Sequence, residues 1–166
     1  MGDDGKAFWD FTLKLYGKPG VSPALIGLQD RLGADVNLLL FCCWAATRGI
    51  ELAAADLAAA DTAVRGWREQ VVEPLRGVRN RIKAGIPGGV ASETAMAFRK
   101  RVLELEIAGE EIAQQAIATA LPDRRLEGAP SAAARRHLDR YLARLERKPG
   151  EADRAAVDAV VTGCFG

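Results

Sequence analysis

The stretch DVNLLLFCCWAA, residues 35–46, constrains the fold more than any other part of the sequence. A helix over these residues is apolar on every side, which is typical of a helix surrounded by other helices. Asp35 is well placed to cap this helix, because an aspartate side chain accepts a hydrogen bond from the first turn. The run is shorter than the roughly 20 residues that span a bilayer, and Asn37 interrupts it. We therefore expect a buried central helix near residues 35–48 and no membrane insertion.

The rest of the sequence also has helical spacing. Apolar residues recur at steps of three and four, and no segment of useful length alternates apolar with polar residues as a half-buried strand does. We expect an all-α fold, a single-domain helical bundle of about six or seven helices over residues 1–166. A chain of this length buries roughly 70% of the surface that its unfolded form exposes, so its stability requires neither disulfides nor a structural metal.

Local signals indicate several helix ends. Ser22 before Pro23 is a start signal, since a serine hydroxyl can cap a free amide and proline at the first helical position loses no hydrogen bond. Pro74 lies inside the fourth helical region, where it removes one backbone hydrogen bond and crowds the preceding turn. We therefore expect a kink or a break near Val72.

A helical hairpin is predicted around the loop AGIPGG, residues 84–89. Ser92 can begin the next helix, whose expected apolar face consists of Phe98, Val102, Leu105, Gly109, Ile112 and Ala116. Two helices joined by a short glycine-rich loop pack antiparallel. Two further helices follow, one bearing Leu138 and Tyr141 and one over residues 151–162.

Two stretches near the N-terminus carry a resemblance to a known family. FWDFTLKLYGKPGV, starting at Phe8, and LQDRLGADVNLLLFCCW, ending at Trp44, resemble an uncharacterised proteobacterial family of small proteins, a conserved domain of unknown function. The resemblance covers residues 8–48 and extends through WREQVVEPLRGVRNRIK, residues 67–83. It implies a bacterial, cytosolic and helical protein, and it supplies no activity, cofactor or catalytic residue.

Few residues are typical of catalysis or metal binding. His137 is the only histidine, which excludes a multi-histidine metal site within one chain, and we expect it at the surface or at its boundary. Cys42 and Cys43 lie in the apolar run, where burial disfavours the reactive thiolate. With Cys164 they make three cysteines, which cannot all pair within one chain and favour a reducing, cytoplasmic location. We predict no metal and no cofactor, and a non-enzymatic role is favoured.

Four acids gather on the predicted fifth helix: Glu104, Glu106, Glu110 and Glu111. Glu106 and Glu110 share one helix face, as paired catalytic carboxylates do. Acids on a long helix beside an arginine-rich one are more typical of a solvated, ion-paired surface. We therefore expect these four side chains on a solvated, ion-paired surface.

A basic cluster stands out in a protein whose net charge is only +1. It consists of Arg76, Arg79, Arg81, Lys83, Arg99, Lys100 and Arg101. The predicted hairpin brings these residues to one end of the bundle, where they form a patch that attracts phosphate or acidic protein surfaces. The alternative is a solubilising face, because cations near a helix C-terminus interact favourably with the helix dipole.

The second candidate site surrounds Asn37. A buried amide without partners costs about 1 to 3 kcal/mol. In one interpretation Asn37 bonds a neighbouring loop or helix end and fixes how the central helix docks. In the other, Asn37 contacts a ligand in a pocket together with Trp44 and Asp30.

These sites lead to three hypotheses about function. The favoured one is a non-enzymatic interaction or adaptor protein that binds an anionic protein partner through the basic hairpin. A nucleic-acid-binding module is less favoured, because aromatic residues are not interleaved with the basic ones. A small-ligand binder or enzyme with a pocket near Asn37 and Trp44 is the third. The sequence does not indicate the oligomeric state.

Overall fold

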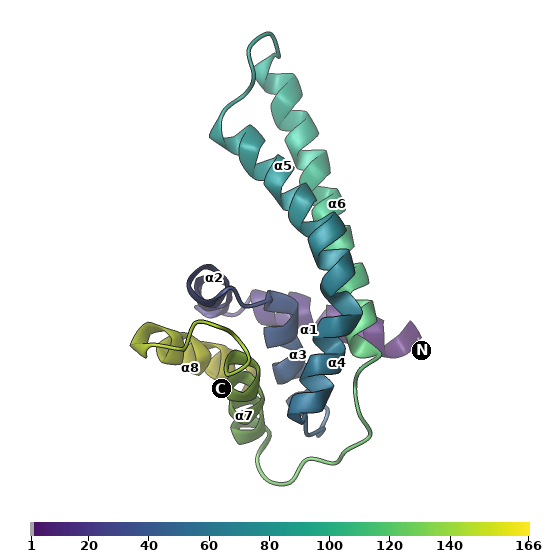
Figure 1. Cartoon of the computed structure of the whole chain (residues 1–166), viewed down its shortest axis with the longest axis vertical. Coiled ribbons are helices and arrows are strands. Elements are labelled where there is room, and N and C mark those ends of the chain that lie inside the picture. Colours follow the sequence, from purple (N-terminus) through teal and green to yellow (C-terminus); the bar gives the residue numbers. More distant parts are fainter. Residues whose placement is uncertain (1) are drawn as a thin grey trace.

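The computed structural model describes residues 2–166, and over these residues the chain is all-α, as predicted. Eight α-helices and one π-helical segment follow one another: α1 (Gly2–Tyr16), α2 (Val21–Leu32), α3 (Val36–Thr47), α4 (Ala54–Trp67), η1 (Arg68–Val72), α5 (Glu73–Ala84), α6 (Ser92–Ala118), α7 (Pro130–Leu142) and α8 (Glu151–Phe165). Figure 1 shows most helices gathered at one end, while α5 and the N-terminal half of α6 project away from them side by side. We call this projecting part, residues 73–105, the arm. None of the helices within residues 2–166 combines the length and the apolar character that crossing a membrane requires.

Helix α3 lies at the centre of the bundle and contacts α1, α2, α4, α6 and α7. The side chain of Asp35 accepts a hydrogen bond from the backbone N–H of Asn37 at 2.8 Å, which confirms the predicted cap. Phe8 of α1 stacks on Trp44 of α3 with ring centroids 4.8 Å apart, and Phe41 lies beside both. Stacked aromatic rings contribute free energy beyond the burial of their area, so this cluster fixes α1 on the central helix.

Helix α7 packs on α3 and carries His137, which is fully buried. Its Nε2 accepts a hydrogen bond from the backbone N–H of Leu52 at 3.0 Å, and its Nδ1 donates to the carbonyl oxygen of Cys42 at 3.0 Å. Burial lowers the pKa of His137, which keeps the ring neutral as these two bonds require. The expected surface position is therefore wrong. Charged neighbours in the sequence suggested solvent, but Ala134 and Leu138 place this side of the helix against α3.

The chain changes helical form before Pro74, as predicted. The π-helical segment η1 ends at Val72, and Pro74 stands in the first turn of α5. Proline donates no backbone hydrogen bond and its ring crowds the carbonyl four residues earlier, and the wider π turn accommodates both. The predicted fourth helical region is therefore divided into α4 and α5.

The start of α2 lies one residue earlier than Ser22. The helix begins at Val21, after Gly20 with a φ of 79°. A left-handed residue at this place suits glycine, which has no Cβ to clash. Ser22 lies inside the first turn, and its side chain is not the cap of this helix.

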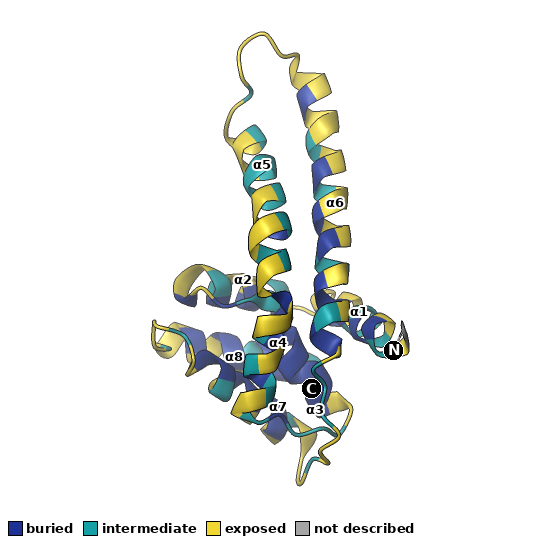
Figure 2. Ribbon diagram, turned by 45° about the vertical axis from the view of Figure 1, so that its right-hand side comes forward, coloured by how far each residue is buried: buried dark blue, intermediate teal, exposed yellow. Residues whose placement is uncertain are grey.

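The predicted apolar face of α6 is only partly correct. Val102 and Gly109 are buried, but Phe98, Leu105 and Ile112 are 56%, 59% and 46% exposed. Figure 2 shows the buried side of α6 turned toward α5, with its opposite side in solvent. The difference arises because α1, α4 and α5 cover a face of α6 that is rotated from the one the apolar residues define. We call Phe98, Leu105 and Ile112 the exposed stripe.

Candidate functional site

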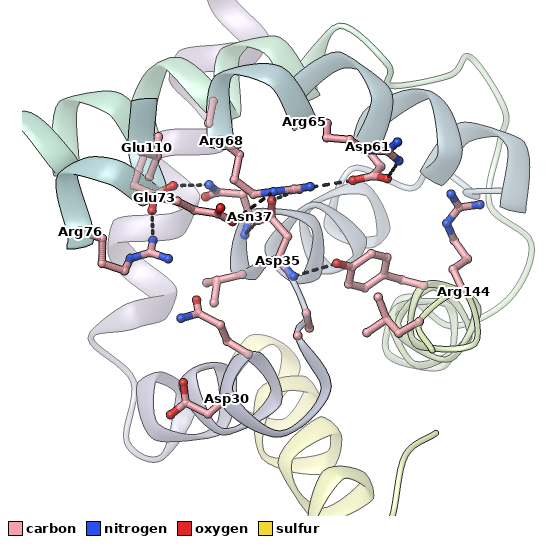
Figure 3. A pocket seen from close by; sticks show the side chains of 18 residues that line it. Asp30, Asp35, Asn37, Asp61, Arg65, Arg68, Glu73, Arg76, Glu110 and Arg144 are labelled. Atoms are coloured by element: carbon pink, nitrogen blue, oxygen red, sulfur yellow. Dashed lines mark hydrogen bonds and ion pairs between the residues drawn. The ribbon is translucent and has the colours of Figure 1, made fainter. Parts of the chain in front are cut away.

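A cleft of about 720 Å³ lies at the base of the arm, where residues from α2, α3, α4, η1, α5, α6 and α7 meet (Figure 3). Its lining is dominated by charge. It contains four arginines, Arg65, Arg68, Arg76 and Arg144, and five acids, Asp30, Asp35, Asp61, Glu73 and Glu110. Opposite charges are therefore nearly balanced around one concave space.

Asn37 connects α3 to α6 at the inner wall of the cleft. Its side chain is buried, donates to Glu110 Oε2 at 2.5 Å and accepts from Gln114 Nε2 at 2.9 Å. The Oε1 of Gln114 in turn accepts from the hydroxyl of Thr12 at 3.0 Å. The amide is thus satisfied within the protein, by side chains of α6 rather than by the loop or helix end that the sequence suggested.

The acids of α6 are held by arginines of α5. Arg76 donates through Nη2 to Glu110 at 2.6 Å and through Nε to Glu106 at 3.0 Å, and Arg79 donates to both oxygens of Glu106. These two acids are ion-paired as expected, but their expected exposure to solvent is wrong, because Glu106 is buried and Glu110 is half-buried. The guanidinium groups of the α5 arginines make the burial of these carboxylates possible, since a buried charge must be paired.

The two carboxylates respond to their surroundings in opposite ways. Burial opposes ionisation of Glu106, but the hydrogen bonds from Arg79 and Arg76 outweigh it and lower the pKa of this carboxyl. Burial raises the pKa of Glu110, and the hydrogen bond from Asn37 and the charge of Arg76 offset only part of the increase. Glu106 is therefore firmly anionic, whereas Glu110 is the easier of the two to protonate.

Arg68 crosses the opposite wall of the cleft. Its Nη1 donates to Asp35 Oδ2 at 2.6 Å and lies 3.3 Å from Asp61 Oδ1. Its Nη2 is 3.9 Å from Glu69 and its Nε is 3.8 Å from Glu73, which are too long for hydrogen bonds. Among residues 2–166, the N–H groups on these two nitrogens have no acceptor.

Tyr141 of α7 closes the floor of the cleft beside Asp35. Its hydroxyl oxygen accepts the backbone N–H of Asp35 at 2.8 Å, and its side chain is almost completely buried. Burial raises the pKa of Tyr141, so the hydroxyl keeps its hydrogen. No residue of the described part of the chain accepts that hydrogen.

The fold keeps two of the three residues of the predicted pocket together. Asp30 and Asn37 both line the cleft. Trp44 does not, because it is buried in the aromatic cluster with Phe8 and Phe41. The cleft therefore shares Asp30 and Asn37 with the predicted pocket, but not Trp44.

The seven residues of the predicted basic patch are also divided. Arg76 and Arg79 are engaged by Glu106 and Glu110 at the base of the arm. The other five lie farther out on the arm and form no ion pair within residues 2–166: Arg81, Lys83, Arg99, Lys100 and Arg101. We call these five the distal cations.

Sequence reasoning missed Arg65, Arg68, Tyr141 and Arg144. A signal for the first two was present, since Asp61, Arg65 and Arg68 are spaced by four and three and so share one helix face. No local signal places Tyr141 and Arg144 opposite that face, because their position depends on how α7 docks.

The chemistry that the cleft offers comes mainly from charged side chains. Its described lining contains no serine, cysteine or histidine, so its five carboxylates are the groups there that can exchange protons near neutral pH. Within residues 2–166 no three histidine, cysteine or acidic side chains are grouped so that they could hold a metal ion. The arginines and amides can donate hydrogen bonds to a ligand.

The sequence matches one family model over most of its length. A model described as a protein of unknown function, DUF2390, matches residues 7–117, which extend from α1 almost to the end of α6. No curated protein matches the chain, and no solved structure does. The match agrees with the resemblance to a domain of unknown function, and because it covers more than half of the sequence, the chain belongs to the DUF2390 family.

Proposed function

We propose that the chain is a cytosolic, non-enzymatic interaction protein whose arm binds an acidic helix of a partner protein. The observation that carries this proposal is the contrast along the arm. Arginines at its base are neutralised by Glu106 and Glu110, whereas the five distal cations have no acidic partner within residues 2–166. Unneutralised cations concentrated on a projecting element attract acidic surfaces. The three free cysteines suit a reducing compartment.

The exposed stripe supports a protein partner. Phe98, Leu105 and Ile112 are seven residues apart, so they follow one line along the solvent side of α6. Large apolar side chains at this spacing form the surface on which a second helix packs. Arg101 lies beside the stripe, three residues after Phe98 and four before Leu105, and can pair with acids that flank the apolar face of such a helix.

The same features favour protein over nucleic acid. Phe98 is the one aromatic residue between residues 73 and 105, so consecutive bases have no row of rings on which to stack. Leu105 and Ile112 offer apolar area that a nucleic acid backbone does not use.

Capture from a native bacterial lysate tests the proposal. Wild-type protein, the charge-reversed variant R81E/R101E and the stripe variant L105E are immobilised, and captured proteins are identified by mass spectrometry at low and high salt. We expect wild type to capture an acidic protein whose binding weakens with salt and survives nuclease treatment, and we expect both variants to lose it. Exposed charges contribute little to stability, so the melting temperature of R81E/R101E should stay close to that of wild type.

A matched control is K14E/K18E, which has the same charge change on exposed residues outside the arm. It should capture the same protein as wild type. Retention of every partner by R81E/R101E would show that the distal cations only solubilise the arm. Capture that disappears with nuclease would identify a nucleic acid instead.

A further inference from the structure

We propose that the cleft at the base of the arm binds a short peptide-like zwitterion, with its carboxylate on Arg68, Tyr141 and Arg144 and its ammonium group near Asp30. This site is separate from the distal cations, so the inference does not depend on the proposed function.

Unused hydrogen-bond donors indicate the anionic end of the ligand. A guanidinium has five N–H groups, and only those on Nη1 of Arg68 are used, by Asp35 and Asp61. The hydroxyl of Tyr141, whose side chain is 4% exposed, keeps one hydrogen without an acceptor in the described residues. Arg144 also lines the cleft and forms no ion pair within residues 2–166. Three residues that line the cleft therefore have donors without acceptors within residues 2–166.

The inner acids cannot supply those acceptors. Asp35 accepts from Asn37 and Arg68, one bond on each oxygen, and Glu110 likewise accepts from Asn37 and Arg76. Asp61 is held by Arg65 and Arg68. The free donors are therefore open to a group from outside the chain, and a carboxylate fits a guanidinium with two parallel hydrogen bonds.

One other acid indicates the cationic end. Asp30 is exposed and accepts no hydrogen bond from residues 2–166. In the view of Figure 3 it lies on the opposite side of the cleft from Arg144. Glu73 is within ion-pair distance of Arg68, at 3.8 Å from its Nε. Since arginines also hold the other three acids of the lining, Asp30 is left to pair with an ammonium group.

The size of the cleft favours a peptide-like ligand over a single amino acid. A volume of about 720 Å³ falls within the roughly 300–1,000 Å³ of small-molecule sites. It has room for two or three linked residues between the two charged ends.

Binding is tested with three probes on one scaffold: a mixed dipeptide pool, the same pool acetylated at its N-termini, and the same pool amidated at its C-termini. Isothermal titration of the full chain should show the free dipeptides binding at least about tenfold more tightly than either blocked pool, since each blocked pool loses one charged contact. No heat with any pool, or equal affinity for all three, would overturn the proposal.

Two variants assign the ends of the ligand. Arg144→Gln should weaken binding of the free and the acetylated pools and leave the amidated pool unchanged. Asp30→Asn should weaken binding of the free and the amidated pools and leave the acetylated pool unchanged. Both residues are exposed and form no ion pair within the described chain, so both variants should keep the wild-type melting temperature.

Two controls separate this result from the proposed function. Arg147→Gln changes an exposed arginine that does not line the cleft and should bind all pools as wild type does. R81E/R101E, which alters the arm, should also retain dipeptide binding. Unchanged affinities in both Arg144→Gln and Asp30→Asn would place the ligand elsewhere and refute the assignment.

Discussion

At the scale of single residues, the amide in the apolar central helix has a structural explanation. Asn37 donates to Glu110 and accepts from Gln114, so it ties α3 to α6 while keeping every polar atom of its side chain bonded. The cap by Asp35 was predictable because capping is local. The partners of Asn37 were not, because they lie 73 and 77 residues away along the chain.

Replacing Asn37 tests this connection. Asn37→Ala should lower the free energy of unfolding by about 1 to 3 kcal/mol, since Glu110 and Gln114 each lose a buried partner. Asn37→Asp should be worse, because it places a second carboxylate against Glu110. Urea denaturation measures both, and the control Asn80→Ala, at an exposed position, should change stability by less than about 0.5 kcal/mol. Equal stability of Asn37→Ala and wild type would contradict the structural role.

His137 predicts a pH dependence. Its pKa is lowered in the folded protein because burial disfavours the charged ring. The unfolded chain therefore binds a proton more readily than the folded one, and the stabilisation present above the unfolded pKa of about 6.5 is lost as the pH falls toward the folded value. Chemical denaturation between pH 7.5 and pH 5 (roughly the range in which histidine titrates) should show stability falling toward acid.

A comparison with His137→Gln isolates this contribution. The variant should be less stable than wild type at neutral pH, because two buried hydrogen bonds are disturbed. Its stability should also fall less than that of wild type between pH 7.5 and pH 5 (about the same window). The same slope in both proteins would show that other groups produce the pH dependence.

At the scale of helices, the positions of the elements were largely predictable, but the face that α6 buries was not. Pro23, Pro74 and the glycine-rich loop act locally, so the ends of neighbouring helices followed from the sequence within a few residues. The orientation of α6 depends on α1, α4 and α5, which all contact it. Glu106 shows the consequence, because an acid is buried while Leu105 next to it is exposed.

Two substitutions on α6 distinguish the predicted face from the observed one. Val102→Ala should lower the free energy of unfolding by roughly 1 to 2 kcal/mol, because it leaves a gap under α5. Leu105→Ala removes a larger side chain but should change stability by less than about 0.5 kcal/mol, since this residue is mostly in solvent. Thermal or urea denaturation measures the difference. The reverse order would mean that the apolar pattern, and not the observed rotation, describes the helix.

At the scale of the whole molecule, α5 is held on α6 by few buried apolar contacts. α5 has no fully buried residue, so its hold on α6 relies on half-buried apolar side chains and on Arg76 and Arg79. The arginines and acids are visible in the sequence, but their burial could not be predicted from it. Ion pairs in solvent and buried ion pairs show the same spacing of charged residues along the sequence. Segments with few buried apolar contacts open at lower free energy than the core. The arm should therefore open separately from the helices around α3.

Glu106→Gln tests whether these contacts hold the arm. Both arginines would keep a hydrogen-bond acceptor but lose its charge, so amides of α5 should exchange with deuterium several-fold faster, while those of α3 keep the wild-type rate. The control Glu104→Gln changes an exposed acid that forms no ion pair within residues 2–166 and should leave both helices unchanged. Because the pKa of Glu106 is lowered, wild-type α5 should approach the behaviour of the variant only as the pH falls through that folded value. If α3 and α5 accelerate together in Glu106→Gln, the arm and the bundle open as one unit and the ion pairs stabilise the whole fold.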